Sequence, residues 1–323
     1  MNARIIFMGT PVFASVVLER LVRTGYKVVL CITQPDKPSG RKMIMTPPPV
    51  KETAESAGIP VFQPQRLREP SVEDQIRAFR PDLIVTAAYG KILPASILNI
   101  PEKGCLNVHG SLLPQYRGAA PIQWSILNGD TRTGVTIMKM DEGMDTGPVL
   151  RFAVCPIGAD ENAGTLTQKL ALLGAELLAE TIPGYLDGSI TPIAQKESGV
   201  TYAPPIMKEQ GEINWNNTAE SIHNQIRGLS EWPGAYSEYR GKRIKIYCSL
   251  LPKDPDRLIR EYPPGEEKPL PGTVICARKE VLAVMCKDSP LLLTCIQPES
   301  CRKMQSAECA HNFAVSDRFG DSL

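Results

Sequence analysis

The residues best suited to chemistry are an asparagine and a histidine two positions apart, Asn107 and His109, in the segment CLNVHGSLLPQYRG. Side chains two residues apart in an extended strand point to the same face of the sheet. A Gly-Ser pair then ends the strand in a loop, and open α/β sheets bind ligands beyond the carboxyl ends of their strands. An amide donor beside an imidazole can stabilise a developing oxyanion and move a proton. The pair therefore predicts a catalytic site at the edge of a sheet where the carboxyl ends of its strands lie.

A third polar group is needed to orient the imidazole, and Asp145 is the best candidate. It lies in the loop DEGMDTG between two expected strands, and we expect this loop at the same sheet edge as Asn107 and His109. Its carboxylate would accept a hydrogen bond from one ring nitrogen. Each residue taken alone has a structural alternative: a turn-forming aspartate, an asparagine bonded to its own loop, or a sheet-edge histidine with satisfied hydrogen bonds. The three together favour the catalytic interpretation.

Alternating strands and helices would position these residues. Helical patterns lie between the first four expected strands, and the first helix is expected to have Thr10 as its N-cap and Pro11 as its first residue. Residues 164–180 form the clearest amphipathic helix. The alternation predicts an α/β fold with a doubly wound, mostly parallel sheet. Its strands are expected at residues 4–8, 28–33, 82–87, 105–109, 135–140 and 149–154.

The second part of the chain has a different character. Residues 191–208 are rich in proline and lack periodicity, so we expect a linker between a catalytic domain over 1–190 and a second domain over 209–323. A short helix capped by Thr218 is expected to run to Leu229. Short strands separated by Pro/Gly turns then predict a small β-barrel, and the last few polar residues are expected to fray. These strands lie near residues 235–239, 243–248, 272–276, 281–286 and 291–296.

Composition limits the class of protein. Of the 323 residues, 42% are hydrophobic and 22% are charged, as in globular proteins. The sequence has no apolar stretch long enough for a membrane span or a signal peptide, and its nine cysteines form no CxxC pair. We therefore expect a cytoplasmic protein with reduced thiols and no membrane contact. Net charge is +1, and basic and acidic residues are equal in number from Pro205 onward, so nucleic-acid contacts would need local clusters.

Two patterns that could suggest cofactors do not match the known spacings. Cys295, Cys301, Cys309 and His311 fit no common zinc pattern, so we expect no metal. The turn that starts at Gly9 lacks the GxGxxG spacing of nicotinamide-binding loops. The histidine at position 223, on an expected helix, is interpreted as structural.

Five sequence blocks in a fixed order resemble the methionyl-tRNA formyltransferases, and the match runs nearly end to end. The central block is specific for folate-dependent formyltransferases, and the TQPD and GR elements narrow it to the tRNA enzymes. The blocks are FMGTPVFA (7–14), TQPDKPSGR (33–41), AAYGKILP (87–94), NVHGSLLPQYRGAAPIQW (107–124) and TGVTIMKMDEGMDTG (133–147).

The resemblance implies a Rossmann-like formyltransferase domain followed by an OB-like barrel. It also implies transfer of a formyl group from 10-formyltetrahydrofolate to the α-amine of methionyl initiator tRNA, for translation initiation. In that reaction Asn107 would donate a hydrogen bond to the oxyanion, and His109 would stabilise its charge and pass a proton toward the folate nitrogen. Asp145 would hold the imidazole and receive the proton of the amine. The formyl group is already activated, so no metal is required.

The resemblance also implies the folate site. The SLLP segment would contact the folate, because a glycine-led loop with two leucines offers backbone donors and apolar walls to a flat pterin. A second loop, at the end of another strand, would form the opposite wall. The implied folate-binding residues are Ser111, Leu112, Leu113 and Pro114 on the first wall, and Ala88, Tyr89, Gly90, Lys91 and Ile92 on the second.

Basic clusters suggest where tRNA would bind. A run without acidic residues includes Lys37, Arg41 and Lys42, and in the family this insertion enters the acceptor stem beside the mismatched end pair, with Arg41 at the position of its key arginine. In the barrel, Arg243 and Lys245 share one strand face. The linker carries Pro204-Pro205 where the family usually has an acidic residue and a lysine, while Lys208 remains.

We expect a monomer with no protein partner. Two other functions stay open on the sequence. A folate-dependent enzyme of the same chemistry could act on a different acceptor: a sugar-nucleotide amine, a purine ribonucleotide amine or water. Such enzymes should lack the TQPD and GR elements and a terminal barrel of this type. The second is a catalytically inactive RNA-binding protein on the same fold, which the presence of Asn107, His109 and Asp145 disfavours.

Overall fold

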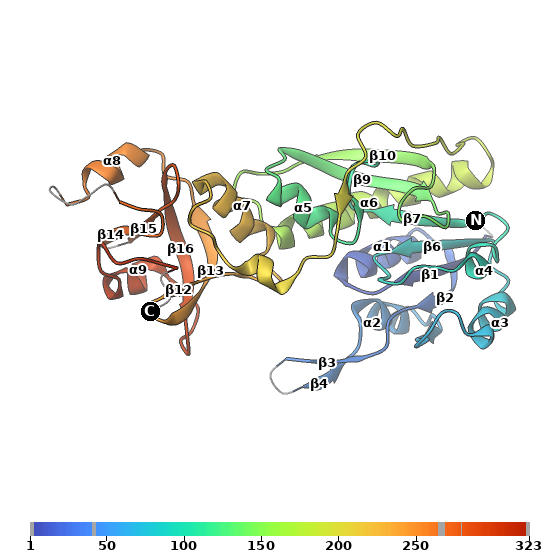
Figure 1. Ribbon diagram of the computed structural model, residues 1–323. Helices are drawn as coiled ribbons and strands as arrows, with labels where there is room; N and C mark the ends of the chain where they lie inside the picture. Colours follow the sequence, from blue (N-terminus) through green and yellow to red (C-terminus); the bar gives the residue numbers. More distant parts are fainter. Residues whose placement is uncertain (1–2, 41–42, 264–268, 279, 321–323) are drawn as a thin grey trace. The chain divides into compact units, whose positions relative to one another are not determined.

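The computed structural model describes residues 3–40, 43–263, 269–278 and 280–320, which fall into two compact units (Figure 1). The first unit comprises Met1–Pro121, Arg132–Pro156 and Thr167–Pro204. The second comprises Ile122–Thr131, Ile157–Leu166 and Pro205–Leu323. Among the described residues, no helix is both long enough and apolar enough to cross a membrane.

A seven-stranded sheet forms the centre of the first unit, in the order β10-β9-β7-β6-β1-β2-β5. Five neighbouring strands are parallel, and the β9–β10 hairpin is antiparallel at one edge. The mostly parallel sheet predicted from the sequence is therefore confirmed. The strands are β1 (Arg4–Gly9), β2 (Lys27–Ile32), β5 (Val61–Phe62), β6 (Leu83–Ala87), β7 (Cys105–His109), β9 (Arg132–Lys139) and β10 (Val149–Pro156).

Helices flank this sheet, and the longest of them fixes the position of β7. At Gly174 of this helix, an added Cβ would lie 2.8 Å from a methyl carbon of Val108 and 3.1 Å from one of Val135. The helix backbone therefore lies directly on the strands that carry the candidate site. The helices up to residue 190 are α1 (Val12–Arg23), α2 (Pro49–Ser56), α3 (Pro70–Ala78), α4 (Ala95–Leu98), α5 (Pro121–Leu127) and α6 (Ala163–Leu186). Most of α5 and the first residues of α6 belong to the second unit.

The expected start of the first helix is wrong by one residue. Pro11 is the N-cap and α1 begins at Val12, while the side chain of Thr10 makes no cap. The Thr10 hydroxyl instead donates to the carbonyl oxygen of Tyr89, at 3.0 Å. The hydroxyl bonds to the loop after β6 and not to its own helix, a long-range contact that local capping rules do not include.

The antiparallel pairing of β9 corrects the expected position of the Asp145 loop. Lys139, at the end of β9, pairs with Leu106 near the start of β7, and His109 pairs with Thr136. The loop after β9 therefore leaves the sheet at the end opposite to His109. It must fold back along β7 to bring Asp145 to the site. The assumption of a common strand edge holds for parallel neighbours and fails for this hairpin.

The segment that follows α6 is bonded to the first unit. Val149 and Ile193 form an antiparallel bridge, and the short strand β11 (Tyr202–Ala203) pairs in parallel with β8 (Arg117–Gly118). These bonds hold the proline-containing stretch beside the loops that follow β7 and β9.

A two-stranded hairpin, β3 (Lys37–Ser39) with β4 (Ile44–Thr46), extends away from the rest of its unit (Figure 1). Its described residues are exposed, including the apolar side chains of Ile44 and Met45. Arg41 and Lys42 lie outside the described residues.

The second unit is an antiparallel sheet in the order β12-β13-β16-β15-β14, with β17 paired to β16. The expected helix is confirmed as α7 (Ala219–Gly228), and its N-cap Thr218 accepts from the Ser221 N–H at 3.2 Å. The other elements are η1 (Lys208–Gly211), β12 (Ala235–Tyr239), β13 (Lys242–Leu250), α8 (Pro255–Arg260), β14 (Val274–Arg278), β15 (Val281–Met285), β16 (Pro290–Pro298), β17 (Met304–Gln305), α9 (Ser306–Cys309) and η2 (Ala310–Asn312).

The C-terminal segment connects the two edges of this sheet, as expected for a barrel. Phe319 bridges to Tyr239 of β12, and Arg318 bridges to Thr273 beside β14. The N–H of Gly320 donates to Glu238 at 2.8 Å, so the expected fraying does not extend to this residue. Residues 321–323 lie outside the described part.

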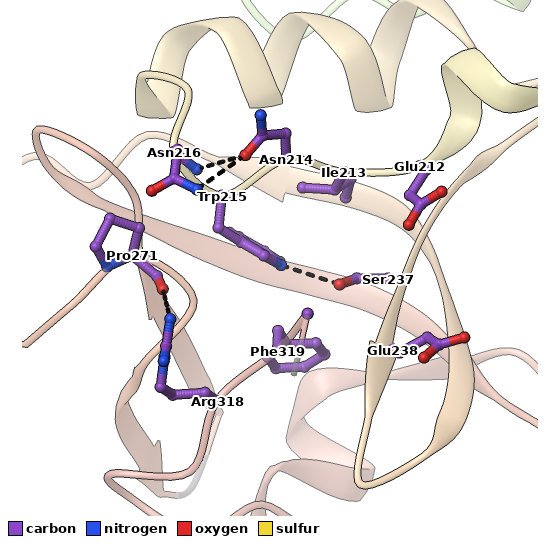
Figure 2. A pocket seen from close by; sticks show the side chains of 11 residues that line it. Glu212, Ile213, Asn214, Trp215, Asn216, Ser237, Glu238, Pro271, Arg318 and Phe319 are labelled. Atoms are coloured by element: carbon purple, nitrogen blue, oxygen red, sulfur yellow. Dashed lines mark hydrogen bonds between the residues drawn. The ribbon is translucent and has the colours of Figure 1, made fainter. Parts of the chain in front are cut away.

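A cavity of about 430 Å³ lies beside this closing segment (Figure 2). The indole N–H of Trp215 donates to the Ser237 hydroxyl at 3.0 Å, and Arg318 donates to the Pro271 carbonyl at 3.2 Å. Both bonds join residues of the second unit, and Trp215 and Phe319 are buried in its hydrophobic core. The aromatic groups at this cavity therefore serve the barrel core.

A substitution at Gly134 of β9 tests how closely the β9–β10 hairpin packs against its neighbours. A Cβ at this position would collide with the carbonyl oxygen of Ala153 and with the Leu112 side chain. We expect Gly134→Ala to lower the free energy of unfolding by about 1–3 kcal/mol, as overpacking does, measured by urea denaturation. The control is Gly158→Ala, where the nearest atom is an ordinary 3.4 Å away. Equal stability of the two variants would contradict this packing.

Candidate active site

One carboxylate meets both residues of the Asn107–His109 pair. Asp145 Oδ1 lies 3.5 Å from Asn107 Nδ2, and Oδ2 lies 3.6 Å from His109 Nδ1. The N–H of Gly118 donates to Oδ2 at 2.9 Å. The structure thus brings the three predicted catalytic residues together, although Asp145 is 36 positions from the histidine in sequence. His109 is 4% exposed, so this contact is largely shielded from water.

The imidazole of His109 lies between two hydrogen-bond acceptors. Its Nε2 is 3.0 Å from the carbonyl oxygen of Tyr116, which can only accept, so this nitrogen carries a proton. Its Nδ1 faces the Asp145 carboxylate. A protonated ring, which donates from both nitrogens, has an acceptor on each side. The arrangement is therefore suited to hold a positive charge next to a developing oxyanion and to exchange a proton there.

The amide of Asn107 is oriented by its neighbour in the sheet. Thr86 of β6 pairs with Asn107 in register, and its hydroxyl donates to Asn107 Oδ1 at 2.8 Å. Because this oxygen accepts from Thr86, the amide nitrogen must point toward Asp145. Asn107 is thus a fixed donor, as stabilisation of an oxyanion requires.

The Asp145 loop is held by a glutamine that the sequence did not single out. Asp145 has a φ of 56°, in the left-handed region that non-glycine residues rarely adopt. Gln195 Nε2 donates to the carbonyl oxygens of Asp145 at 2.7 Å and Gly147 at 2.8 Å. The buried guanidinium of Arg117 donates to Gln195 Oε1 at 2.8 and 3.1 Å. Arg117 and Gln195 therefore clamp the unusual backbone of the loop and act as positioning residues.

This clamp leaves little trace in the sequence. Arg117 belongs to the block QYRG, where a buried arginine looks the same as a surface arginine. Gln195 lies in the proline-rich stretch that resembles a linker. The sequence contains one weak signal for Gln195: it is a long polar side chain in an otherwise aperiodic segment.

The loop after β6 is fixed by its own polar contacts. The Tyr89 carbonyl accepts from Thr10 and, at 3.2 Å, from Gln34. Lys91 Nζ donates to the carbonyl oxygens of Pro64 and Gln65 at 2.9 and 2.8 Å. Partial burial lowers the pKa of Lys91, and the charge of Lys37 adds to this effect.

This loop also presents groups without a partner. The Tyr89 hydroxyl is buried and unpaired among the described residues, and burial raises its pKa to about 12. The Ile92 side chain is 80% exposed. The positive-φ residues Ala88 and Gly90 turn the chain here, at φ 43° and 81°.

The loop after β7 is tied to β9. Thr136 Oγ1 donates to the Ser111 carbonyl at 2.7 Å and accepts from the Leu113 N–H at 3.1 Å. The Ser111 hydroxyl donates to the Gln115 carbonyl at 2.6 Å, and Leu112 packs against β9. Half-buried Pro114 completes the loop. Because β6 and β7 are parallel neighbours, this loop and the one at 88–92 leave the same edge of the sheet.

A cavity of about 520 Å³ lies near the start of β7. Met140, one of its lining residues, has its sulfur 3.2 Å from the Thr86 hydroxyl that orients Asn107. Two side chains, Met140 and Thr86, therefore connect this cavity to the candidate catalytic amide. Sequence reasoning did not identify its lining, which includes Leu98, Cys105, Met140, Asn99, Asp141 and Glu142.

The described basic residues from the sequence analysis are exposed. Lys37 lies on β3, and Lys208 lies on η1. Arg243 and Lys245 alternate on β13 with buried Ile244 and Ile246, and the Arg243 guanidinium lies 4.1 Å from the centre of the Tyr236 ring.

The remaining histidine and cysteine patterns form no metal cluster in the described ranges. His223 is buried, with Nδ1 2.9 Å from the Ser249 hydroxyl and Nε2 3.1 Å from the Ala159 carbonyl. Burial lowers its pKa, and these contacts agree with a structural role.

Known proteins resemble this chain along nearly its full length. The family described as "Formyl transferase" matches residues 3–182, and "Formyl transferase, C-terminal domain" matches residues 205–314. A "Methionyl-tRNA formyltransferase" of Trichlorobacter lovleyi is 48% identical over 304 residues, which cover 94% of this chain and 92% of that protein. The protein of the same name from Bacillus subtilis is 45% identical over 306 residues, covering 94% and 93%.

Solved structures share the fold at low sequence identity. An N-formyltransferase from Helicobacter canadensis, in complex with folinic acid and dTDP-3-aminofucose, has a TM-score of 0.64 at 20% identity and covers 91% of this chain and 99% of its own. HypX from Aquifex aeolicus in complex with tetrahydrofolic acid has a TM-score of 0.61 at 19% identity and covers 95% of this chain and 47% of its own.

The clamp on the Asp145 loop can be tested without an activity assay. In Gln195→Ala the Asp145 loop loses the two hydrogen bonds that Gln195 donates, one to the Asp145 carbonyl and one to the Gly147 carbonyl. We therefore expect the Gly118 N–H, which donates to Asp145, to exchange about tenfold faster with solvent. Hydrogen exchange measured by NMR or mass spectrometry gives the result. The control is Gln63→Ala, which removes two donated hydrogen bonds elsewhere in the first unit, to Gln34 and Asp36. Unchanged exchange at Gly118 in Gln195→Ala would contradict the clamp.

Proposed function

The chain belongs to the formyl transferase family, and from this we propose that it transfers a formyl group from 10-formyltetrahydrofolate to the α-amino group of methionyl initiator tRNA. The observation that carries the proposal is the Asp145 carboxylate, which contacts Asn107 and His109 together. An oriented amide donor and a shielded imidazole are what acyl transfer to an amine requires. The choice of acceptor rests on the relatives that align over 94% of the chain.

Each residue has a distinct role in this proposal. Asn107 Nδ2 donates to the formyl oxygen as negative charge develops on it, a contribution of about 2.7–4 kcal/mol for one such donor. His109 supplies positive charge at the same place and gives a proton to the departing folate nitrogen. Asp145 holds the ring and receives the proton lost by the attacking amine, directly or through water.

The residues present fit a reduced folate. The cavity near Asn107 combines apolar walls from Leu98 and Met140 with the polar side chains of Asn99, Asp141 and Glu142, which suits a flat ring with amino groups on its edge. The Tyr89 hydroxyl, which has no hydrogen-bond partner in the described part of the chain, and the exposed Ile92 lie on the loop that follows β6. We assign to this co-substrate the two loops Ala88–Ile92 and Ser111–Pro114.

The tRNA would contact basic residues of both domains. On the insertion these are Lys37, Arg41 and Lys42, and on the C-terminal side Lys208, Arg243 and Lys245. Alternation on β13 keeps Arg243 and Lys245 exposed while Ile244 and Ile246 fill the core, so the charge is available to phosphates. In this proposal residues 1–190 are the catalytic domain, 191–208 the linker and 209–323 the tRNA-binding domain of a cytoplasmic monomer.

The experiment that tests the proposal is a formylation assay with purified protein, 10-formyltetrahydrofolate and methionyl initiator tRNA. Elongator methionyl-tRNA is the control acceptor. We expect transfer to the initiator and much slower transfer to the elongator. Folate turnover without tRNA formylation would move the function to another amine acceptor or to water, and the absence of any turnover would favour a binding protein.

Replacement of the imidazole tests the catalytic assignment. We expect His109→Gln to lower kcat by about 10²–10⁴, because the proton-transfer group is lost, with little change in the KM for the folate. Steady-state kinetics on initiator tRNA measure both constants. His311→Gln, at an exposed histidine, is the control. A raised KM with an unchanged kcat would contradict a role in the chemical step.

The insertion is tested by Arg41→Ala. If Arg41 reads the end of the acceptor stem, the variant should lose its preference for initiator over elongator tRNA while the KM for the folate stays the same. The measurement is the ratio of kcat/KM for the two acceptors. Lys27→Ala removes an exposed cation of the same domain as a control. An equal loss on both acceptors would show that Arg41 supplies affinity alone.

A further inference from the structure

Two cysteines face each other across neighbouring strands of the barrel. Cys248 of β13 is the register partner of Cys295 of β16. The ladder skips Tyr247 and Thr294 on either side, so the pair lies at a local irregularity of the sheet. Directly opposed residues in an antiparallel pair have Cα atoms about 4.5–5.5 Å apart, within the range of about 4.4–6.8 Å that disulfides span.

The two cysteines are opposed in the sheet and differ in exposure. The Cys248 side chain raises the pKa of the Cys295 thiol. Cys248 is exposed, while Cys295 is 2% exposed. A reagent in solution would therefore meet the Cys248 sulfur first, with a second sulfur directly behind it.

Strand pairing places Cys248, and not another cysteine, opposite Cys295. The third nearby thiol, Cys309, donates to the Gln305 carbonyl at 3.4 Å. Burial raises the pKa of Cys295, while the ammonium of Lys303 acts in the opposite direction. Lys303 is held there over the Tyr247 ring, with Nζ 4.3 Å from its centre. This ammonium favours the thiolate form of Cys295.

We propose that Cys248 and Cys295 form a reversible, peroxide-sensitive disulfide between β13 and β16. The exposed Cys248 is the sulfur that is oxidised, and the buried Cys295 is the sulfur that resolves it. The pair lies in the second unit, and no residue that we assign to catalysis takes part in it. The proposal therefore does not depend on the reaction that the protein catalyses.

The chemistry balances with hydrogen peroxide as the oxidant. The Cys248 thiolate attacks one peroxide oxygen, the O–O bond breaks, and sulfenic acid and water form after proton transfer. The Cys295 sulfur then attacks the Cys248 sulfur, the S–O bond breaks, and a second water leaves. Two thiols are oxidised by two electrons and one peroxide is reduced to two waters. A dithiol reductant reverses the step by exchange.

The test is peroxide treatment of the folded full-length chain, followed by thiol titration and peptide mapping. We expect the number of free thiols to fall by two and a peptide linking Cys248 to Cys295 to appear, and both changes should reverse with dithiothreitol. Cys248→Ser should abolish the link. The matched control Cys301→Ser, at the other exposed cysteine, should leave it unchanged.

A second variant, Cys295→Ala, tests the proposal if Cys248→Ser disturbs folding. In Cys295→Ala the Cys248 sulfenic acid has no partner, so it should accumulate and react with dimedone, and circular dichroism checks that the chain is folded. The proposal would be overturned if peroxide converts Cys248 to sulfinic acid while Cys295 stays reduced. A disulfide that joins Cys248 to Cys301 or Cys309 would overturn it equally.

Discussion

The position of one carboxylate is the constraint on which the site depends. Asp145 must reach Asn107 and His109 from a loop that leaves the sheet at the opposite end of β7, and it does so in a left-handed backbone conformation. That conformation is unfavourable for an aspartate, so neighbouring groups must hold it. The bonds from Gln195, backed by the buried Arg117, supply that support. The geometry of the three proposed catalytic residues thus depends on two side chains outside that group, Arg117 and Gln195.

The parallel strands and the antiparallel hairpin position different parts of the candidate site. The parallel strands β6 and β7 place Thr86 beside Asn107 and send two loops to one edge. The antiparallel hairpin β9–β10 carries Thr136, which ties down the loop after β7, and returns Asp145 to the site. The expected strands and loops could be located from sequence because apolar runs and glycine pairs are local signals. Their pairing direction is a long-range property.

Much of the fold could therefore be predicted from the sequence, as could the proximity of Asn107, His109 and Asp145, but the residues that support the Asp145 loop could not. Asn107 and His109 share a strand, so their juxtaposition follows from a period of two. The predicted Thr10 cap was wrong because the Thr10 hydroxyl donates a hydrogen bond to the carbonyl oxygen of Tyr89, which is far away in the sequence. Gln195 and the cavity at Met140 could not be identified, since their roles arise from contacts between segments far apart in the chain.

The most direct test of the central claim is a double-mutant cycle on kcat with His109→Gln, Asp145→Asn and the double variant. If the chief role of Asp145 is to hold the imidazole, Asp145→Asn should lower kcat far less in the His109→Gln background than in the wild type, and the double variant should remain close to His109→Gln. Losses that multiply in full in the double variant would show that Asp145 acts independently of His109 and contradict the account of a single unit organised by one carboxylate.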